Sequence, residues 1–228
     1  LQAVPGLQVP AGLEAESRLW RFLLDHGLVV EASWEARRLE KRYEDDPGAL
    51  LGLLALAAAR GAHERSVRWA YKLGQRLPDG ASRDAAEVLL FPAPYSVSVA
   101  AAAARHGLSP AVVLGLMRQE SAFDPRIDSG AGARGLMQIM PEVGRRLAAA
   151  AGVNPWHADV LYDPERNLEL GCTLLAEELV RAGGNLAQAL AAYNAGRRAV
   201  NEKGGIPDYP ETREYVKKVI DSYLKNSE

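Results

Sequence analysis

A glutamate in the middle of an apolar helix face is the residue in this sequence best suited to acid chemistry. The segment 111–123 predicts a helix, and Glu120 falls within the arc of its wheel formed by four apolar residues: Val112, Val113, Leu116 and Met117. Burial disfavours the charged form of a carboxyl group, and a pKa raised by about two units costs about 2.7 kcal/mol at neutral pH. A carboxyl group that keeps its proton at neutral pH can protonate a leaving group as a general acid.

Two structural alternatives for Glu120 remain open on the helix face alone. The carboxylate could pair with a buried arginine, or it could reach solvent at the end of the helix. Two further features favour catalysis. The dipole at the helix C-terminus also disfavours an anion, and the glycine-rich segment 127–139 begins within ten residues. Glycine allows the backbone to approach a ligand closely, so this segment is a candidate ligand-binding loop.

A second catalytic carboxylate is not evident near Glu120. Asp124 precedes Pro125, a pair typical of turns, and Asp128 fits a loop-capping role. Neither lies in a buried pattern. The second carboxylate that retaining and inverting glycosidases use is therefore missing here, and the sequence predicts a mechanism with a single acid.

Short helices separated by turn residues account for most of the chain, so we predict an all-α fold. The first series suits stacked helix hairpins or a superhelical segment and covers 13–24, 32–43, 50–59 and 64–77, with the last helix ending at Pro78-Asp79-Gly80. The second series covers 97–106, 111–123, 141–152, 165–181, 186–195 and 210–224, with Ser109 and Asn185 as N-caps and Asp163-Pro164 opening the helix 165–181. Pro92 and Pro94 predict a linker over 91–95, which divides a domain 1–93 from a domain 94–228. Only 127–139 does not fit a helix, and we expect an irregular loop or a small β-hairpin there.

Composition excludes several classes of protein. The 27 basic and 29 acidic residues give a net charge of −2, which argues against a nucleic-acid partner. The single cysteine, Cys172, excludes an internal disulfide and is expected to be structural, and the four histidines have no metal-ligand spacing, so we predict no metal. No apolar run approaches about 18 residues without charges, so we predict no membrane span.

Four motifs occur in an order that resembles the soluble lytic transglycosylases. They are Arg118-Gln119-Glu120-Ser121, the run from Gly132 to Pro141, Ala192-Tyr193-Asn194-Ala195-Gly196, and Glu211-Thr212-Arg213-Glu214-Tyr215-Val216. The resemblance implies a mostly helical, lysozyme-like fold over about 94–225. It also implies cleavage of the MurNAc–GlcNAc β-1,4 bond of peptidoglycan with formation of a 1,6-anhydromuramoyl end, without a cofactor.

The resemblance assigns a role to each matching position. It implies that Glu120 is the acid/base, Ser129 contacts the N-acetyl region of the reacting sugar, Gln138 and Met140 line the glycan groove, Tyr193 and Asn194 lie near the acid, and Glu211 binds substrate near the stem peptide. By spacing alone, Tyr193 is a core residue, Asn194 belongs to a helix C-cap, and Met140 fills a gap. Arg197 and Arg198 replace the small residues usual in the family, so the groove is expected to differ there.

The implied chemistry agrees with a single acid. Protonated Glu120 would donate to the glycosidic oxygen, and the N-acetyl carbonyl of the substrate would shelter the developing cation. The carboxylate would then take the proton of the C6 hydroxyl as that oxygen attacks the anomeric carbon. A hydrolytic muramidase with the same acid and a non-catalytic peptidoglycan-binding helical protein are the alternatives.

Residues 1–93 carry no catalytic motif and loosely resemble the α-superhelical segment of larger family members. They could extend the glycan groove, dock a cell-wall protein partner, or only cap the catalytic domain. The resemblance implies a periplasmic or cell-envelope location. The chain begins at Leu1 without a leader, as expected if an export signal had been removed.

Overall fold

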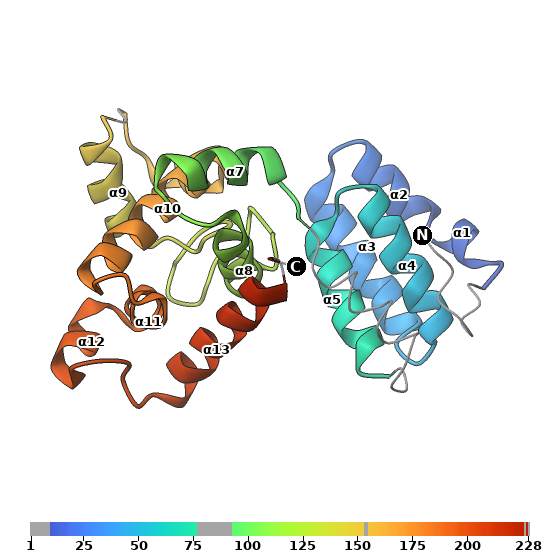
Figure 1. Ribbon diagram of the computed structural model, residues 1–228. Helices are drawn as coiled ribbons and strands as arrows, with labels where there is room; N and C mark the ends of the chain where they lie inside the picture. Colours follow the sequence, from blue (N-terminus) through green and yellow to red (C-terminus); the bar gives the residue numbers. More distant parts are fainter. Residues whose placement is uncertain (1–9, 77–92, 153–154, 226, 228) are drawn as a thin grey trace. The chain divides into compact units, whose positions relative to one another are not determined.

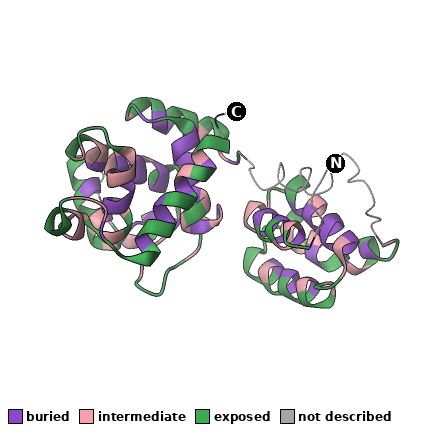
Figure 2. Cartoon of the chain, turned by 60° about the horizontal axis from the view of Figure 1, so that its bottom comes forward, coloured by how far each residue is buried: buried purple, intermediate pink, exposed green. Residues whose placement is uncertain are grey.

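The computed structural model describes residues 10–76, 93–152, 155–225 and 227, and these confirm the all-α prediction (Figure 1). Contacts divide the chain into two compact units, Leu1–Pro94 and Tyr95–Glu228. Within each unit, buried residues lie on the helix faces that meet and exposed residues cover the outside (Figure 2). The described part of the chain contains no β-strand, only two isolated bridges.

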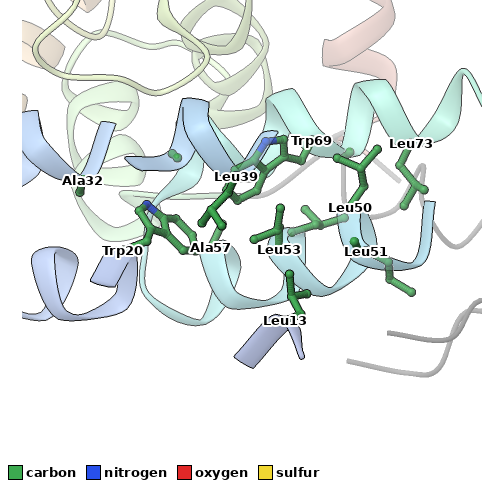
Figure 3. Close-up of a cluster of buried hydrophobic side chains, with 14 residues drawn as sticks. Leu13, Trp20, Ala32, Leu39, Leu50, Leu51, Leu53, Ala57, Trp69 and Leu73 are labelled. Atoms are coloured by element: carbon green, nitrogen blue, oxygen red, sulfur yellow. The ribbon is translucent and has the colours of Figure 1, made fainter. Parts of the chain in front are cut away.

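The first unit is built around one helix that is apolar on nearly all sides. Eight of the thirteen residues of α4 are buried, and the side chain of Asp46 caps its N-terminus by accepting from the Ala49 amide at 3.0 Å. Trp20 and Trp69 meet edge to face in the same core, with ring centroids 5.2 Å apart (Figure 3). The helices are α1 (Leu13–Glu16), α2 (Arg18–Asp25), α3 (Val29–Arg42), α4 (Pro47–Ala59) and α5 (His63–Gly74).

The first helix of this unit differs from its prediction. The single helix expected over 13–24 is wrong, because it is interrupted at Ser17, which is fully buried between α1 and α2. The turn at Pro78-Asp79-Gly80 and residues 91–92 of the expected linker lie outside the described residues.

The second unit surrounds α8 with the other helices. Every residue of α8 from Ala111 to Met117 is buried, and α13 packs along it. Gly115 permits this contact, since a Cβ there would lie 3.0 Å from the Val219 carbonyl oxygen. The elements are α7 (Ser96–Arg105), α8 (Pro110–Ser121), α9 (Pro141–Ala150), the 3₁₀ helix η1 (Ala158–Tyr162), α10 (Pro164–Arg181), α11 (Leu186–Ala195), α12 (Arg197–Lys203) and α13 (Pro210–Lys225).

The sequence analysis did not predict two short helices of this unit, and it placed the end of a third helix too far along the chain. The 3₁₀ helix η1 and the helix α12 carry too little apolar periodicity to be recognised, and α12 has no buried residue. The helix expected to reach Phe123 ends at Ser121, because Ala122 and Phe123 adopt positive φ angles of 49° and 68°.

The N-cap predicted at Asn185 is confirmed, since its side chain accepts from the Gln188 amide, and Asp163 likewise accepts from the Arg166 amide. Ser109 holds the N-cap position of α8 as predicted, but its side chain makes no capping hydrogen bond.

The segment expected to be irregular is confirmed as a loop with two antiparallel bridges. Arg134 pairs with both Asp128 and Ile139. Among the described residues, no single helix is both long and apolar enough to cross a membrane; α7 and α8 satisfy those conditions only as a pair bent by 117°.

Candidate active site

Glu120 lies in the last turn of α8, where its carboxyl group is partly buried. Its burial raises the pKa from an ordinary value of 4.5 to about 7. The predicted rise in pKa is therefore confirmed, and its main cause is desolvation. No ion pair holds Glu120 in the described part of the chain, so the buried-arginine alternative is not what the structure shows.

A tyrosine hydroxyl opposes part of this shift. Tyr215, on α13, is 5% exposed and donates a hydrogen bond to Oε1 of Glu120, which lowers the pKa of the carboxyl group. Burial, and after it the negative charge of Glu120, raise the pKa of the Tyr215 phenol well above its usual value. The phenol therefore stays protonated and remains a donor. Sequence reasoning gave Tyr215 no role, although it stands four residues after Glu211 in the last quoted motif.

A second tyrosine near the acid is Tyr193, on α11. Burial and the charge of Glu120 raise the pKa of its phenol, which places it within electrostatic range of that carboxyl group. Its hydroxyl donates to the Met137 carbonyl oxygen at 2.8 Å. Tyr193 therefore satisfies its buried hydroxyl through the glycine-rich loop rather than through Glu120.

Three helices form a cavity of about 300 Å³ around the exposed side of Glu120. Two predicted residues, Asn194 and Glu211, line it with the acid. Thr212 donates to Oδ1 of Asn194 at 2.9 Å, so this amide joins α11 to α13, and the helix C-cap is Gly196. Figure 1 shows the three helices, α8, α11 and α13. The residues that line the cavity are Gln119, Glu120, Asn194, Glu211, Glu214, Tyr215 and Lys218.

The other three predicted residues belong to the glycine-rich loop and its exit, and none of them lines this cavity. Ser129 is exposed and its hydroxyl accepts from the Ala133 amide at 2.9 Å. Gln138 has a φ of 47°, and its amide donates to two carbonyl oxygens of the same loop. Met140 precedes α9 and is 40% exposed. Ser129 and Gln138 thus shape the loop through their own side chains.

A fully buried asparagine that the sequence reasoning missed anchors that loop. Asn167, on α10, accepts from the Met137 amide at 2.7 Å and donates to the carbonyl oxygens of Arg134 and Leu161 at 2.9 and 2.8 Å. These bonds pair the buried Met137 amide and Leu161 carbonyl, and they add a second donor to the Arg134 carbonyl, which also accepts from the Ile139 amide. Its only signal in the sequence is an uncharged polar residue on the apolar side of a helix.

A serine next to the acid fixes the same loop from α8. The Ser121 hydroxyl is buried and donates to the Leu136 carbonyl oxygen at 2.8 Å. Gly135 completes the fit, because its φ is 75° and a Cβ there would lie 2.1 Å from the Leu161 carbonyl oxygen. The end of α8 that carries Glu120 is therefore bonded directly to a tightly packed loop.

The arrangement suits a group that must both give and take a proton. A carboxyl group with a pKa of about 7 is present in both forms at neutral pH, which is the condition for a general acid that next serves as a base. Asp124 and Asp128 take structural roles, since one accepts from the Arg126 amide and the other from the Tyr162 hydroxyl. Within the described ranges, no group of three or more histidine, cysteine, aspartate or glutamate residues could hold a metal ion.

Comparison with known proteins identifies the family of the second unit. The family described as "Transglycosylase SLT domain" matches residues 98–216, which contain Glu120, the loop and Tyr215. The chain belongs to this family. As an SLT domain protein it has a lysozyme-like all-α domain, as the sequence predicts.

Relatives of the SLT domain protein carry transglycosylase names. It is 36% identical over 113 residues to a transglycosylase of Enterobacteria phage PRD1, covering 50% of this chain and 39% of the relative. It is 34% identical over 128 residues to the soluble lytic murein transglycosylase of Escherichia coli K12, covering 49% of this chain and 20% of the relative. The chain therefore spans well under half the length of these relatives.

Two solved structures share the fold of this SLT domain protein. A lytic transglycosylase Slt from Pseudomonas aeruginosa superimposes with a TM-score of 0.81 and 24% identity, covering 98% of this chain and 38% of that one. The 70 kDa soluble lytic transglycosylase of Escherichia coli superimposes with a TM-score of 0.80 and 23% identity, and the match covers 98% of this chain and 38% of that one.

Proposed function

We propose that this SLT domain protein is a peptidoglycan lytic transglycosylase. It cleaves the MurNAc–GlcNAc β-1,4 bond and forms 1,6-anhydromuramoyl ends. The observation that carries the proposal is the carboxyl group of Glu120, whose pKa is about 7 in a cavity without a second buried carboxylate. We assign the catalytic domain to residues 94–228.

The first half of the reaction uses Glu120 as an acid. Its proton passes to the glycosidic oxygen as that bond breaks, and the muramoyl C1 becomes an oxocarbenium-like centre. The N-acetyl group of the substrate stabilises this centre, which removes the need for a second carboxylate. Tyr215 donates to Glu120 throughout this step, so the carboxylate that forms keeps one hydrogen bond.

The second half uses Glu120 as a base. The carboxylate takes the proton of the C6 hydroxyl while that oxygen bonds to C1, so the acid is regenerated and no water is consumed. An oxygen held within the same sugar outcompetes water through its effective concentration, provided that the ring keeps the right conformation. We propose that Ser129, Gln138, Met140, Tyr193, Asn194 and Glu211 form the surfaces that hold it.

The remaining proposals concern the rest of the chain. We propose that residues 1–93 extend the surface offered to the glycan strand; the comparisons provide no protein partner for them. The relatives are named soluble or membrane-bound lytic murein transglycosylases, which supports a periplasmic or cell-envelope location.

The test is digestion of purified sacculi, followed by mass spectrometry of the released fragments. Anhydro ends, lighter by one water than hydrolysed ends, support the proposal. Hydrolysed ends indicate a muramidase, and binding without release indicates a non-catalytic protein. Glu120→Gln must abolish release, whereas Glu142→Gln, an exposed change on α9 outside the cavity, must not.

A further inference from the structure

Arg197 and Arg198, which replace the small residues usual in the family, have different partners in the structure. Arg198 lies 2.7 Å from Glu202 in an exposed ion pair within α12. Arg197 instead binds Glu178 on α10, whose side chain is only 6% exposed. Its Nε donates to one carboxylate oxygen at 3.1 Å, and its Nη2 donates to the other. Such a two-point contact fixes the direction of the pair as well as its length.

Glu178 is a buried charge that requires a partner. A carboxylate taken out of water is costly unless it is paired and hydrogen-bonded. Arg181 lies 3.9 Å away, which is too far for a hydrogen bond, so the hydrogen bonds to this carboxylate come from Arg197. A buried ion pair is often no more stable than two apolar side chains of similar volume. The pair is therefore better explained by the direction that it imposes than by added stability.

This ion pair lies at the end of the helix that carries Asn194. Arg197 is the first residue of α12, and only Gly196, with a φ of 82°, separates it from the end of α11. Asn194 stands three residues before Arg197 and lines the cavity of the acid. Because α12 has no buried residue, its own packing adds little to the hold. The end of α11 is thus tied to α10 through Arg197 and to α13 through the hydrogen bond from Thr212 to Asn194.

We propose that Arg197 is a positioning residue for the cavity and that it acts through Asn194. Its ion pair with Glu178 fixes the corner between α11 and α12, and this corner sets the place of the Asn194 amide in the cavity wall. The Oδ1 atom of that amide accepts from Thr212, so its NH₂ group can donate to the sugar. A group misplaced by about 1 Å can lower a rate about a hundredfold. This inference rests on the proposed function, since it concerns the surface that holds the reacting ring.

The test removes the ion pair without leaving a buried charge. A paired variant, Arg197→Met with Glu178→Leu, replaces both charges by apolar side chains, so the fold is retained while the directional contact is lost. Arg198→Met removes the exposed pair with Glu202 on the same helix and is the matched control. The rates of anhydro-end release from purified sacculi give kcat and KM for each protein. Circular dichroism checks that each variant is folded.

We expect the paired variant to lower kcat about tenfold and to change KM less than about twofold, because the lost constraint acts on the reacting ring rather than on binding of the strand. Arg198→Met should match the parent. A folded paired variant with the kcat of the parent would overturn the inference. A rise in KM alone, or an equal loss for Arg198→Met, would overturn it as well.

A milder change decides the question if the paired variant does not fold. Arg197→Lys keeps the charge beside Glu178 but cannot make the two-point contact. We expect it to lower kcat about threefold with little change in KM. A kcat equal to that of the parent would show that charge compensation is sufficient and that the direction of the pair does not matter.

A double-mutant cycle measures whether the effect passes through Asn194. In an Asn194→Ala background the paired variant should lower kcat less than about twofold further, since residues that act as one unit are not additive. A further loss of about tenfold in that background would mean that the pair acts on another part of the site. That result would contradict the role assigned to Arg197.

A failure of the proposed function is distinguishable from a failure of the positioning role. If the parent releases no fragments from sacculi, the proposed function is wrong. Amide hydrogen exchange over residues 190–203 then still tests the hold on the end of α11, because exchange requires no cleavage. Faster exchange in the paired variant than in Arg198→Met supports the hold, and equal exchange refutes it.

Discussion

Replacing Glu120 by glutamine should stabilise the second unit at alkaline pH while abolishing cleavage. In the unfolded chain this carboxyl group titrates near 4.5, whereas in the folded chain its pKa is about 7. Above 4.5 the unfolded chain releases the proton and the folded chain retains it. The stability associated with this group is therefore fully present below 4.5 and is lost as pH rises through 7.

The difference between the two pKa values sets the magnitude. It corresponds to a loss of about 3 kcal/mol in the free energy of unfolding between acidic and alkaline pH. Glutamine has the shape of the neutral acid and can still accept from Tyr215, but it does not ionise. The gain of Glu120→Gln over the parent should thus grow by about 3 kcal/mol from about pH 4 to about pH 8.5.

The single cysteine allows this stability to be measured for the second unit alone. Cys172, on α10, is fully buried, so a brief pulse of thiol reagent in urea marks chains in which this unit is unfolded. Parent and variant are compared at each pH, which cancels the pH dependence of the labelling reaction. Glu214→Gln, an exposed carboxylate, is the matched control and should show no such gain. A gain for Glu120→Gln that is the same at both pH values would refute the buried, neutral acid.

Other residues give narrower predictions. Tyr215→Phe removes the hydrogen bond that lowers the pKa of Glu120, so the alkaline limb of the pH–rate profile should move up by about one unit; an unchanged or lower limb would contradict that role. Asn167→Ala leaves the buried Met137 amide and Leu161 carbonyl unpaired and should cost about 3 kcal/mol in urea unfolding, and a loss below about 1 kcal/mol would argue against it as the loop anchor. Gly135→Ala should prevent stable folding of the second unit, because its Cβ would collide with a backbone carbonyl, while Gly130→Ala in the same loop meets nothing within 4 Å and should be tolerated; both are read by thiol labelling.

The helical class and the position of the acid could be derived from sequence because both depend on local periodicity. The apolar arc around Glu120 is contained in one helix, and it already implies burial and a raised pKa. The caps at Asp163 and Asn185 are equally local, since each side chain bonds to an amide three residues away. The break at Ser17 and the short helix α12 were missed because neither alters the apolar pattern that the sequence shows.

The partners of the acid were decided only by tertiary structure. The Tyr215 hydroxyl reaches Glu120 across 95 residues, and the Asn167 side chain joins backbone groups up to 33 residues away. Such bonds depend on the angle and distance at which helices pack, which periodicity along one helix does not encode. The sequence therefore predicts which carboxyl group is buried away from water. The packing of α13 against α8 determines which side chain donates a hydrogen bond to that carboxyl group and which charged residues line its cavity.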